Sequence, residues 1–117
     1  MFTNNFNNYA CINDSITCTI GKYKFTAKIV YDPDSSVNDF DCYSESDISR
    51  WKNDEWYFCG IVLSCKYNGI SLKCNESLWG IECNFSDSNS YLSEVANELL
   101  SNYDYENARK EMLNALN

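Results

Sequence analysis

The stretch that decides the fold is Trp56–Tyr67, WYFCGIVLSCKY, which is followed directly by Asn68 and Gly69. Its aromatic and β-branched residues predict a strand. Asn-Gly accepts the two positive φ angles of a type I′ turn, so the chain is expected to reverse there. A return strand over 70–81, kinked near Asn75, completes the predicted hairpin.

A second hairpin is predicted upstream of the first. Residues 15–20, SITCTI, are alternating and β-branched, and a two-residue turn separates them from residues 23–31, YKFTAKIVY. Successive side chains of a strand point to opposite faces. One face of 23–31 therefore carries aromatic and aliphatic side chains, and the other carries Lys24, Thr26 and Lys28.

The pattern changes to a helical one in residues 88–117. Apolar side chains recur there with a period of 3.6, at Leu92, Val95, Ala96, Leu99, Leu100 and Tyr103. Asp104 can cap a further helical segment, so we expect either one bent helix or two consecutive helices. The predicted fold class is α+β: an antiparallel β-sheet built of hairpins, with one or two C-terminal α-helices packed on it.

The length of 117 residues and the single proline indicate one domain over 1–117. Residues 1–12 are rich in asparagine and are expected to form a ragged N-terminus. Residues 37–54 are polar and acidic, which predicts a long loop with one short helical turn. Loops of this length usually have a function, and this one is a candidate lid over a ligand.

Nine basic and 17 acidic side chains give a net charge of −8. Direct binding to duplex DNA is not expected, because that needs a cationic face. Three interpretations of the charge remain: a local cationic pocket for a small anionic ligand, an acidic surface that imitates nucleic acid, or solubility alone. No apolar run approaches the length of a membrane span and no signal peptide is visible, so we expect no membrane partner and a cytoplasmic location.

The content of cysteine and histidine argues against an enzyme. The chain has seven cysteines, no C-x-x-C pair and no histidine, which disfavours a zinc site and removes histidine-dependent nucleophiles. It has no phosphate-binding glycine motif and no convincing pair of catalytic carboxylates. We therefore expect no catalytic residue, no metal and no cofactor.

The chain has two arginines, and a planar guanidinium is well suited to grip a phosphate. Arg50 lies in the predicted loop and Arg109 on the terminal helix. Each has acidic neighbours with which it could form an ion pair instead: Asp47 and Asp54 for Arg50, and Glu106 and Glu111 for Arg109.

Five aromatic residues are candidates for stacking on a nucleobase. They are Trp51, Trp56, Trp79, Tyr103 and Tyr105. A base stacked on an aromatic ring contributes ~1–3 kcal/mol. The competing interpretation is that these rings belong to the hydrophobic core, which is expected for at least two of the three tryptophans.

Two stretches carry a resemblance to a known family. One is 51–57, WKNDEWY, and the other is 76–82, ESLWGIE, which is followed by 91–94, YLSE, and by the helix with Arg109. From Trp51 to the end, the chain resembles the first described type of Thoeris anti-defence proteins, which are encoded by phages.

The resemblance implies an antiparallel sheet with C-terminal helices that assembles into a homodimer or higher oligomer. It implies sequestration, without cleavage, of cyclic ADP-ribose isomers made by bacterial TIR-domain enzymes, so that the Thoeris effector is not activated. Capture of cyclic oligonucleotides at separate sites is a further implication. Arg109 matches the phosphate-contacting arginine of the terminal helix, whereas Arg50 and the aromatic residues are proposed from their chemistry.

Two other functions are compatible with the sequence. The first is an acidic DNA mimic that inhibits a CRISPR or restriction nuclease, which should bind a protein and ignore small nucleotides. The second is a viral assembly protein without a ligand, which should form oligomers that do not respond to nucleotides.

Overall fold

The computed structural model describes residues 1–86 and 88–116, so Asp87 and Asn117 lie outside the described residues. The strands are β1 (Ser15–Ile20), β2 (Tyr23–Tyr31), β3 (Tyr57–Tyr67), β4 (Ile70–Ser71) and β5 (Glu76–Cys83). The helices are the 3-10 turn η1 (Val37–Asp39), α1 (Glu45–Lys52), α2 (Ser90–Ser101) and α3 (Tyr105–Leu116). This is the α+β class predicted from the sequence.

The strands form one antiparallel sheet in which β1 pairs β2, β2 pairs β3, and β3 pairs both β4 and β5. Both predicted hairpins are confirmed. The turn after β3 places Asn68 at φ 52° and Gly69 at φ 84°, as a type I′ turn requires.

The predicted return strand over 70–81 is interrupted. β4 ends at Ser71 and β5 begins at Glu76. Between them Leu72 turns into the core, and the backbone N–H groups of Lys73 and Cys74 donate to the carboxylate of Glu111 on α3. A tertiary contact therefore replaces the strand pairing that the local sequence favours.

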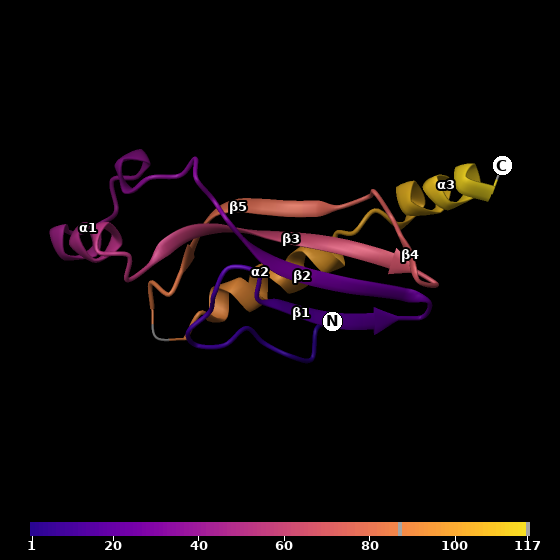
Figure 1. The fold of residues 1–117 in the computed structure, drawn as a ribbon, viewed down its shortest axis with the longest axis horizontal. Helices are drawn as coiled ribbons and strands as arrows, with labels where there is room; N and C mark the ends of the chain where they lie inside the picture. The colour runs from indigo at the N-terminus through magenta and orange to yellow at the C-terminus, as the bar shows by residue number, and fades with distance from the viewer. Residues whose placement is uncertain (87, 117) are drawn as a thin grey trace.

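Helix α2 covers one face of the sheet, and the other face is open except at the α1 end, where a second small core covers Phe58 (Figure 1). The buried side chains of Leu92, Val95 and Ala96 come from α2, and Phe25 and Ile61 are among those that meet them from β2 and β3. The C-terminus contains two helices rather than one bent helix. The break falls at residues 102–104, where the ring of Tyr103 enters the core.

The expectation of a ragged N-terminus is wrong. Residues 1–12 form no helix or strand, but Phe2, Phe6 and Ala10 are buried in the main core. Their backbone N–H groups donate to side chains of the C-terminal half of the chain: Asn97, Ser93 and Asn84 respectively. The residues between these buried anchors are mostly asparagine, which favours neither helix nor strand, so the local sequence did not indicate that the segment would pack into the core.

Residues 37–54 are also more ordered than a loop. Capping boxes begin both η1 and α1: Ser36 pairs with Asp39, and Ser44 pairs with Asp47. Tyr43, Ile48 and Trp51 pack against a second small core. Where the sequence predicted one short helical turn, the structure has an eight-residue helix that packs against aromatic side chains.

The molecule is elongated, with principal extents of 56 × 26 × 19 Å. Helix α1 lies at one end and α3 at the other (Figure 1). None of the helices in the described part of the chain is long and apolar enough to cross a membrane.

Candidate functional site

The predicted ligand residues do not gather into one site within a single copy of the chain. Arg50, Trp51 and Trp56 lie at the α1 end, whereas Arg109 lies on α3 at the opposite end (Figure 1). Any site that used both arginines would need two copies of the chain.

Arg50 holds α1 to the rest of the domain. Its Nη2 donates to the backbone oxygen of Phe85 at 3.3 Å, and its Cζ lies 5.9 Å from the centre of the Phe85 ring. Its ion pair is with Glu55, at 3.9 Å, rather than with Asp47 or Asp54. Because these contacts occupy the guanidinium, Arg50 has a clear structural role.

Trp56 and Tyr103 belong to the core, which corrects their assignment to a ligand site. Trp56 is fully buried and its Nε1 donates to the backbone oxygen of Asp47 at 2.9 Å. The buried hydroxyl of Tyr103 donates to the backbone oxygen of Cys74 at 3.0 Å. Neither ring has a free face for a nucleobase.

Trp51 and Tyr105 are half-buried and also pack against core rings. The ring of Trp51 lies 6.4 Å from that of Phe58, and the ring of Tyr105 lies 5.2 Å from that of Tyr23. Their remaining exposed edges are far from each other, since one lies on α1 and the other begins α3.

Arg109 is exposed, and no acidic side chain of the described residues lies within 4.0 Å of it. The two expected partners are engaged elsewhere. Glu106 pairs with Lys110 at 3.7 Å, and Glu111 accepts the backbone N–H groups that precede β5. Arg109 is therefore available to an anion on the surface of α3.

Trp79 is the one predicted aromatic residue with a broad accessible surface, at 47% exposure. The six-membered part of its indole lies over Gly60 on the open face of the sheet, and its Nε1 donates to Ser77 Oγ at 3.2 Å. A Cβ at position 60 would fall within 2.6 Å of Trp79 Cζ3. Because glycine has no Cβ, position 60 leaves room for the indole to contact the sheet.

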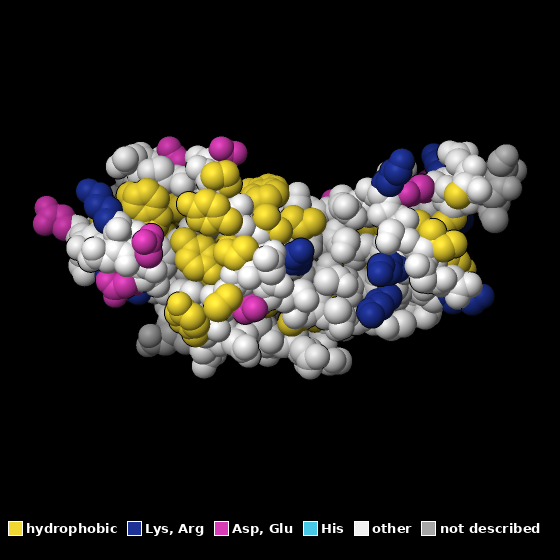
Figure 2. Space-filling model, viewed as in Figure 1, with side chains coloured by type: hydrophobic (Ala, Val, Ile, Leu, Met, Phe, Trp, Pro, Cys, Tyr) yellow, Lys and Arg dark blue, Asp and Glu magenta, His cyan; other side chains and the backbone are white. Residues whose placement is uncertain are grey.

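Three lysines that were not among the predicted site residues occupy the same open face. Lys24 on β2 lies directly opposite Lys66 on β3, and Lys28 lies opposite Val62. All three lysines are exposed. In Figure 2, several dark blue side chains lie in the middle and at the right, and the broadest hydrophobic area lies left of the middle; further dark blue side chains lie at the left end. The alternation of residues 23–31 already placed Lys24 and Lys28 together.

The cross-strand neighbours of these lysines are rich in hydroxyls. The cross-strand neighbours of Lys24 and Lys28 on β1 are Thr19 and Ser15, and the row between them pairs Thr17, Thr26 and Ser64. In the described structure none of the three lysines has an acidic side chain within 4.0 Å. A protein of charge −8 therefore presents a cationic strip.

A shallow pocket of about 330 Å³ lies next to Trp79 and is lined by Tyr31, Pro33 and Ser35, among others. It is shaped by Asp32, a buried carboxylate. Burial alone would raise the pKa of Asp32, but hydrogen bonds from the Ser35 hydroxyl and from the backbone N–H groups of Asp34, Gly80 and Ser35 lower it below its usual value.

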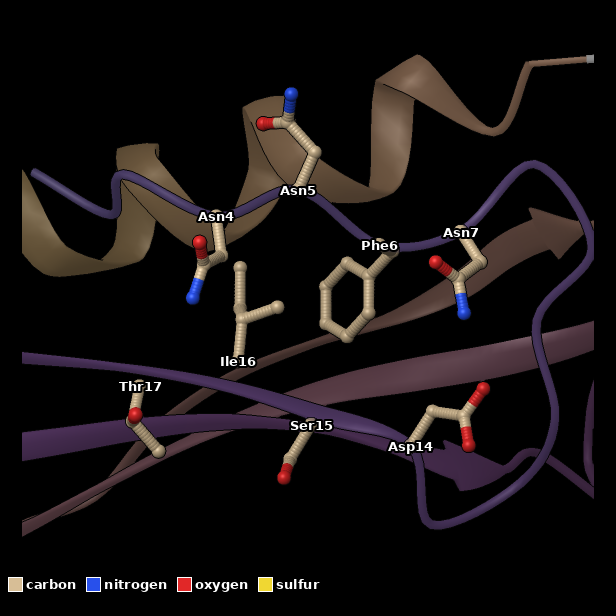
Figure 3. A pocket seen from close by; sticks show the side chains of 8 residues that line it. All are labelled: Asn4, Asn5, Phe6, Asn7, Asp14, Ser15, Ile16 and Thr17. Carbon is tan, nitrogen blue, oxygen red and sulfur yellow. The ribbon is translucent and has the colours of Figure 1, made fainter.

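A larger groove of about 450 Å³ separates the N-terminal segment from β1 (Figure 3). Phe6 and Ile16 point into the space between the two segments, while the side chains of Ser15 and Thr17 point away toward the open face (Figure 3). Asp14 is its one ionisable side chain, so the groove offers no cation to a phosphate.

The cysteines form no metal site among residues 1–86 and 88–116. Cys59 and Cys83 are buried neighbours on β3 and β5. Contact with Cys83 and burial together raise the pKa of the Cys59 thiol, so it stays protonated. These thiols behave as small core residues.

Comparison with models of protein families, with curated proteins and with solved structures finds no match to the chain. The fold and the surface chemistry are therefore the basis for the function.

Proposed function

We propose that the protein is a non-catalytic binding protein that sequesters a small anionic nucleotide on the open face of its sheet. The observation that carries this proposal is the combination of Lys24, Lys28 and Lys66, none of them ion-paired within the described part of the chain, with the exposed indole of Trp79 on one surface. Lysines supply charge for phosphates, and the indole supplies a stacking surface for a base.

The spacing on the sheet suits such a ligand. Lys28 is opposite Val62, which is two residues from Gly60 under the indole, so these positions are about 7 Å apart along the strand. Lys24 and Lys66 follow about 14 Å further along the same face. One nucleotide can reach from the indole to Lys28, whereas Lys24 and Lys66, about 21 Å from the indole along the strand, supply positive charge further along the same face.

The pairing of Lys24 with Lys66 adds support. Like charges directly opposite in an antiparallel sheet are destabilising. Among the described residues, no acidic side chain of β1, β2 or β3 is paired with either lysine across the strands. A bound phosphate between the two ammonium groups would remove the repulsion, which gives the arrangement a reason to exist.

The resemblance to Thoeris anti-defence proteins suggests which nucleotide the protein binds. We propose cyclic ADP-ribose isomers, with cyclic oligonucleotides as further ligands, captured without cleavage in the bacterial host cytosol during phage infection. Sequestration needs no catalytic group, in keeping with the absence of histidine from the sequence. The proposal includes self-association, and Arg109 is the further phosphate contact that the resemblance implies.

The first test is whether the protein captures the proposed ligand from a cell lysate. The purified protein is mixed with a lysate from cells whose TIR enzyme has been activated, washed and heated, and the released fraction is analysed by mass spectrometry. An intact cyclic ADP-ribose isomer is the expected result. Binding of that isomer and of a cyclic dinucleotide is then measured by calorimetry, where a sponge should show a Kd near nanomolar, about −12 kcal/mol.

Variants locate the site. Trp79→Ala should weaken binding by roughly 5- to 150-fold, the equivalent of ~1–3 kcal/mol of stacking. Lys24→Ala combined with Lys66→Ala should weaken it by tenfold or more. Lys52→Ala, an exposed lysine on α1, is the matched control and should leave the Kd unchanged. Failure to bind either nucleotide, or binding that ignores the face variants, would refute the site.

A second function is favoured by the concentration of acidic side chains at the α1 end. Residues 32–55 hold eight of the 17 acidic side chains and only two basic ones. This end could imitate DNA and occupy a basic groove of a CRISPR or restriction nuclease. A mimic should capture such a nuclease in a pull-down, lose it when Asp39, Asp41 and Glu45 are neutralised, and ignore cyclic nucleotides.

A further inference from the structure

The two free edges of the sheet differ in how they are protected against pairing with another chain. The outer edge at β5 carries Glu76 and Glu82 and is bent by an irregular register near Gly80, which has φ 72°. Charges and bulges of this kind discourage edge pairing. The outer edge at β1, SITCTI, has no charge, no proline and no bulge.

Backbone geometry shows which groups of β1 are unpaired. Ile29 N–H donates to Asp14 O at 2.9 Å, and this bond makes Ser15 and Lys28 a non-hydrogen-bonded pair of the antiparallel ladder. Ser15, Thr17 and Thr19 therefore direct their N–H and C=O groups away from β2. Within the described residues, none of these N–H groups has a hydrogen-bond acceptor on the outer side.

The N-terminal segment runs past this edge without pairing to it. Phe2 and Phe6 donate their N–H groups to Asn97 and Ser93 on α2, so the segment is bound to the helix layer. The groove of about 450 Å³ lies between it and β1 (Figure 3). Residues 4–7 thus lie beside Asp14–Thr17 across the groove, but the described residues leave the outward backbone groups of β1 without a hydrogen-bond partner.

We propose that β1 pairs antiparallel with β1 of a second copy, with the two-fold axis at Thr17. In this register Ser15 lies opposite Thr19 of the partner subunit and Thr17 opposite Thr17 of the partner subunit. The three outward-facing pairs then form about six N–H···O=C bonds, two for each pair. The pairing deepens the proposed function, because it names the interface of the self-association proposed there.

We infer that the strand that pairs with β1 belongs to a second copy of the chain, because the sequence of β1 is complementary to itself. Reading outward from Thr17 in either direction gives an apolar residue, Cys18 or Ile16, and then a hydroxyl, Thr19 or Ser15. Antiparallel pairing therefore places hydroxyls opposite hydroxyls on the open face and apolar groups opposite each other on the helix face. It also brings Asp14 diagonally toward Lys22 of the partner subunit, an attraction between opposite charges.

The pairing would join the two lysine strips into one surface. The row with Lys66, Lys24 and Thr19 continues into Ser15 of the partner subunit and then Lys28 of the partner subunit. Six lysines then lie on a continuous two-fold face, which suits an anionic ligand that is itself close to symmetric. Isologous interfaces of this kind are the commonest form of homodimer.

The first test is the mass of the protein in solution, by light scattering after gel filtration. The wild type should have the mass of two chains. Thr17→Lys places two ammonium groups opposite each other at the axis and should give the mass of one chain. Thr26→Lys adds the same charge in the same row but one strand inside the edge, and should remain a dimer. Far-UV circular dichroism checks that each variant is folded.

The second test reads the register directly. In a background with the exposed cysteines replaced, Cys11→Ser and Cys42→Ser, the change Thr17→Cys should give a disulfide-linked dimer under mild oxidation, because only the residue on the axis lies opposite itself. Thr26→Cys should not. A monomeric wild type, a dimeric Thr17→Lys, or equal cross-linking at 17 and 26 would overturn the pairing. A dimer that binds no nucleotide would support the pairing and reject the proposed function.

Discussion

The carboxylate of Asp32 joins the loop after β2 to the bend in β5. It accepts hydrogen bonds from Ser35 Oγ at 2.8 Å and from Gly80 N–H at 2.9 Å, besides two from its own loop. Removing the charge leaves buried donors with a weaker acceptor. Asp32 thereby fixes the bend that places Trp79 beside Gly60.

Asp32→Asn should lower the free energy of unfolding by ~1–3 kcal/mol in urea at pH 7. The pKa of Asp32 is lowered by folding, so its contribution is present above the unfolded pKa of about 4 and is lost as the pH falls through the folded pKa. The difference between wild type and variant should therefore narrow below about pH 4. Asp34→Asn, at an exposed neighbour, should change stability by less than ~0.5 kcal/mol. A difference that stays constant with pH would contradict this account.

The contact between Gly60 and Trp79 provides a second prediction at the same scale. Gly60→Ala forces the indole off the sheet, which should cost ~1–3 kcal/mol of stability and weaken nucleotide binding. In a Trp79→Ala background the same change should cost much less, since nothing then lies over position 60. Urea unfolding of the four proteins in this double-mutant cycle measures the coupling, and an additive result would show that the indole does not rest there.

Among the elements, those defined by local chemistry were predictable from sequence. The Asn68-Gly69 turn and the alternation of residues 23–31 specify hairpins within a few residues, and the 3.6 period specifies α2. The order of residues 1–12 was not predictable, because Phe2 and Phe6 gain their places from α2, more than eighty residues away. The break between β4 and β5 likewise depends on Glu111.

The candidate site shows the same limit. Trp56 and Tyr103 have the residue types of a stacking site, but burial decides whether a ring is available, and no local pattern distinguished them from Trp79. Lys24 and Lys28 were visible as one face of a strand. Their partner Lys66 comes from β3, and only the register between the strands brings it opposite Lys24.

Helix α3 should be the least stable element. Both α2 and α3 have 12 residues, a length that is marginal for a helix in water, but α2 buries five residues and Ala108 is the one buried residue described in α3. The carboxylate of Glu111 ties α3 to Lys73 and Cys74. Glu111→Ala should increase amide hydrogen exchange over residues 105–116 by tenfold or more while β2 and β3 keep their protection. Glu106→Ala, which removes only an exposed ion pair, is the control and should have little effect. Equal exchange in the two variants would mean that Glu111 does not anchor the helix.

At the scale of the whole molecule, charge is separated along the long axis of 56 Å. The acidic residues of 32–55 gather at the α1 end, and Lys24 and Lys66 lie at the far ends of β2 and β3, toward α3 (Figures 1 and 2). At physiological ionic strength charges are screened over about 8 Å, and at 0.01 M over about 30 Å. The acidic end should therefore oppose anion binding only in dilute buffer.

This separation predicts how salt acts on a variant with Asp39→Asn, Asp41→Asn and Glu45→Gln. At 0.01 M salt the variant should bind a cyclic nucleotide more tightly than the wild type, by up to several-fold, because a distant repulsion has been removed. At 0.15 M the two Kd values should coincide. Calorimetry at both ionic strengths gives the comparison, with Lys24→Ala as the reverse control, which should bind more weakly at either. If the neutralised variant changes the Kd equally at both salt concentrations, the carboxylates of the α1 end lie in the ligand site. The nucleotide then does not bind on the lysine face.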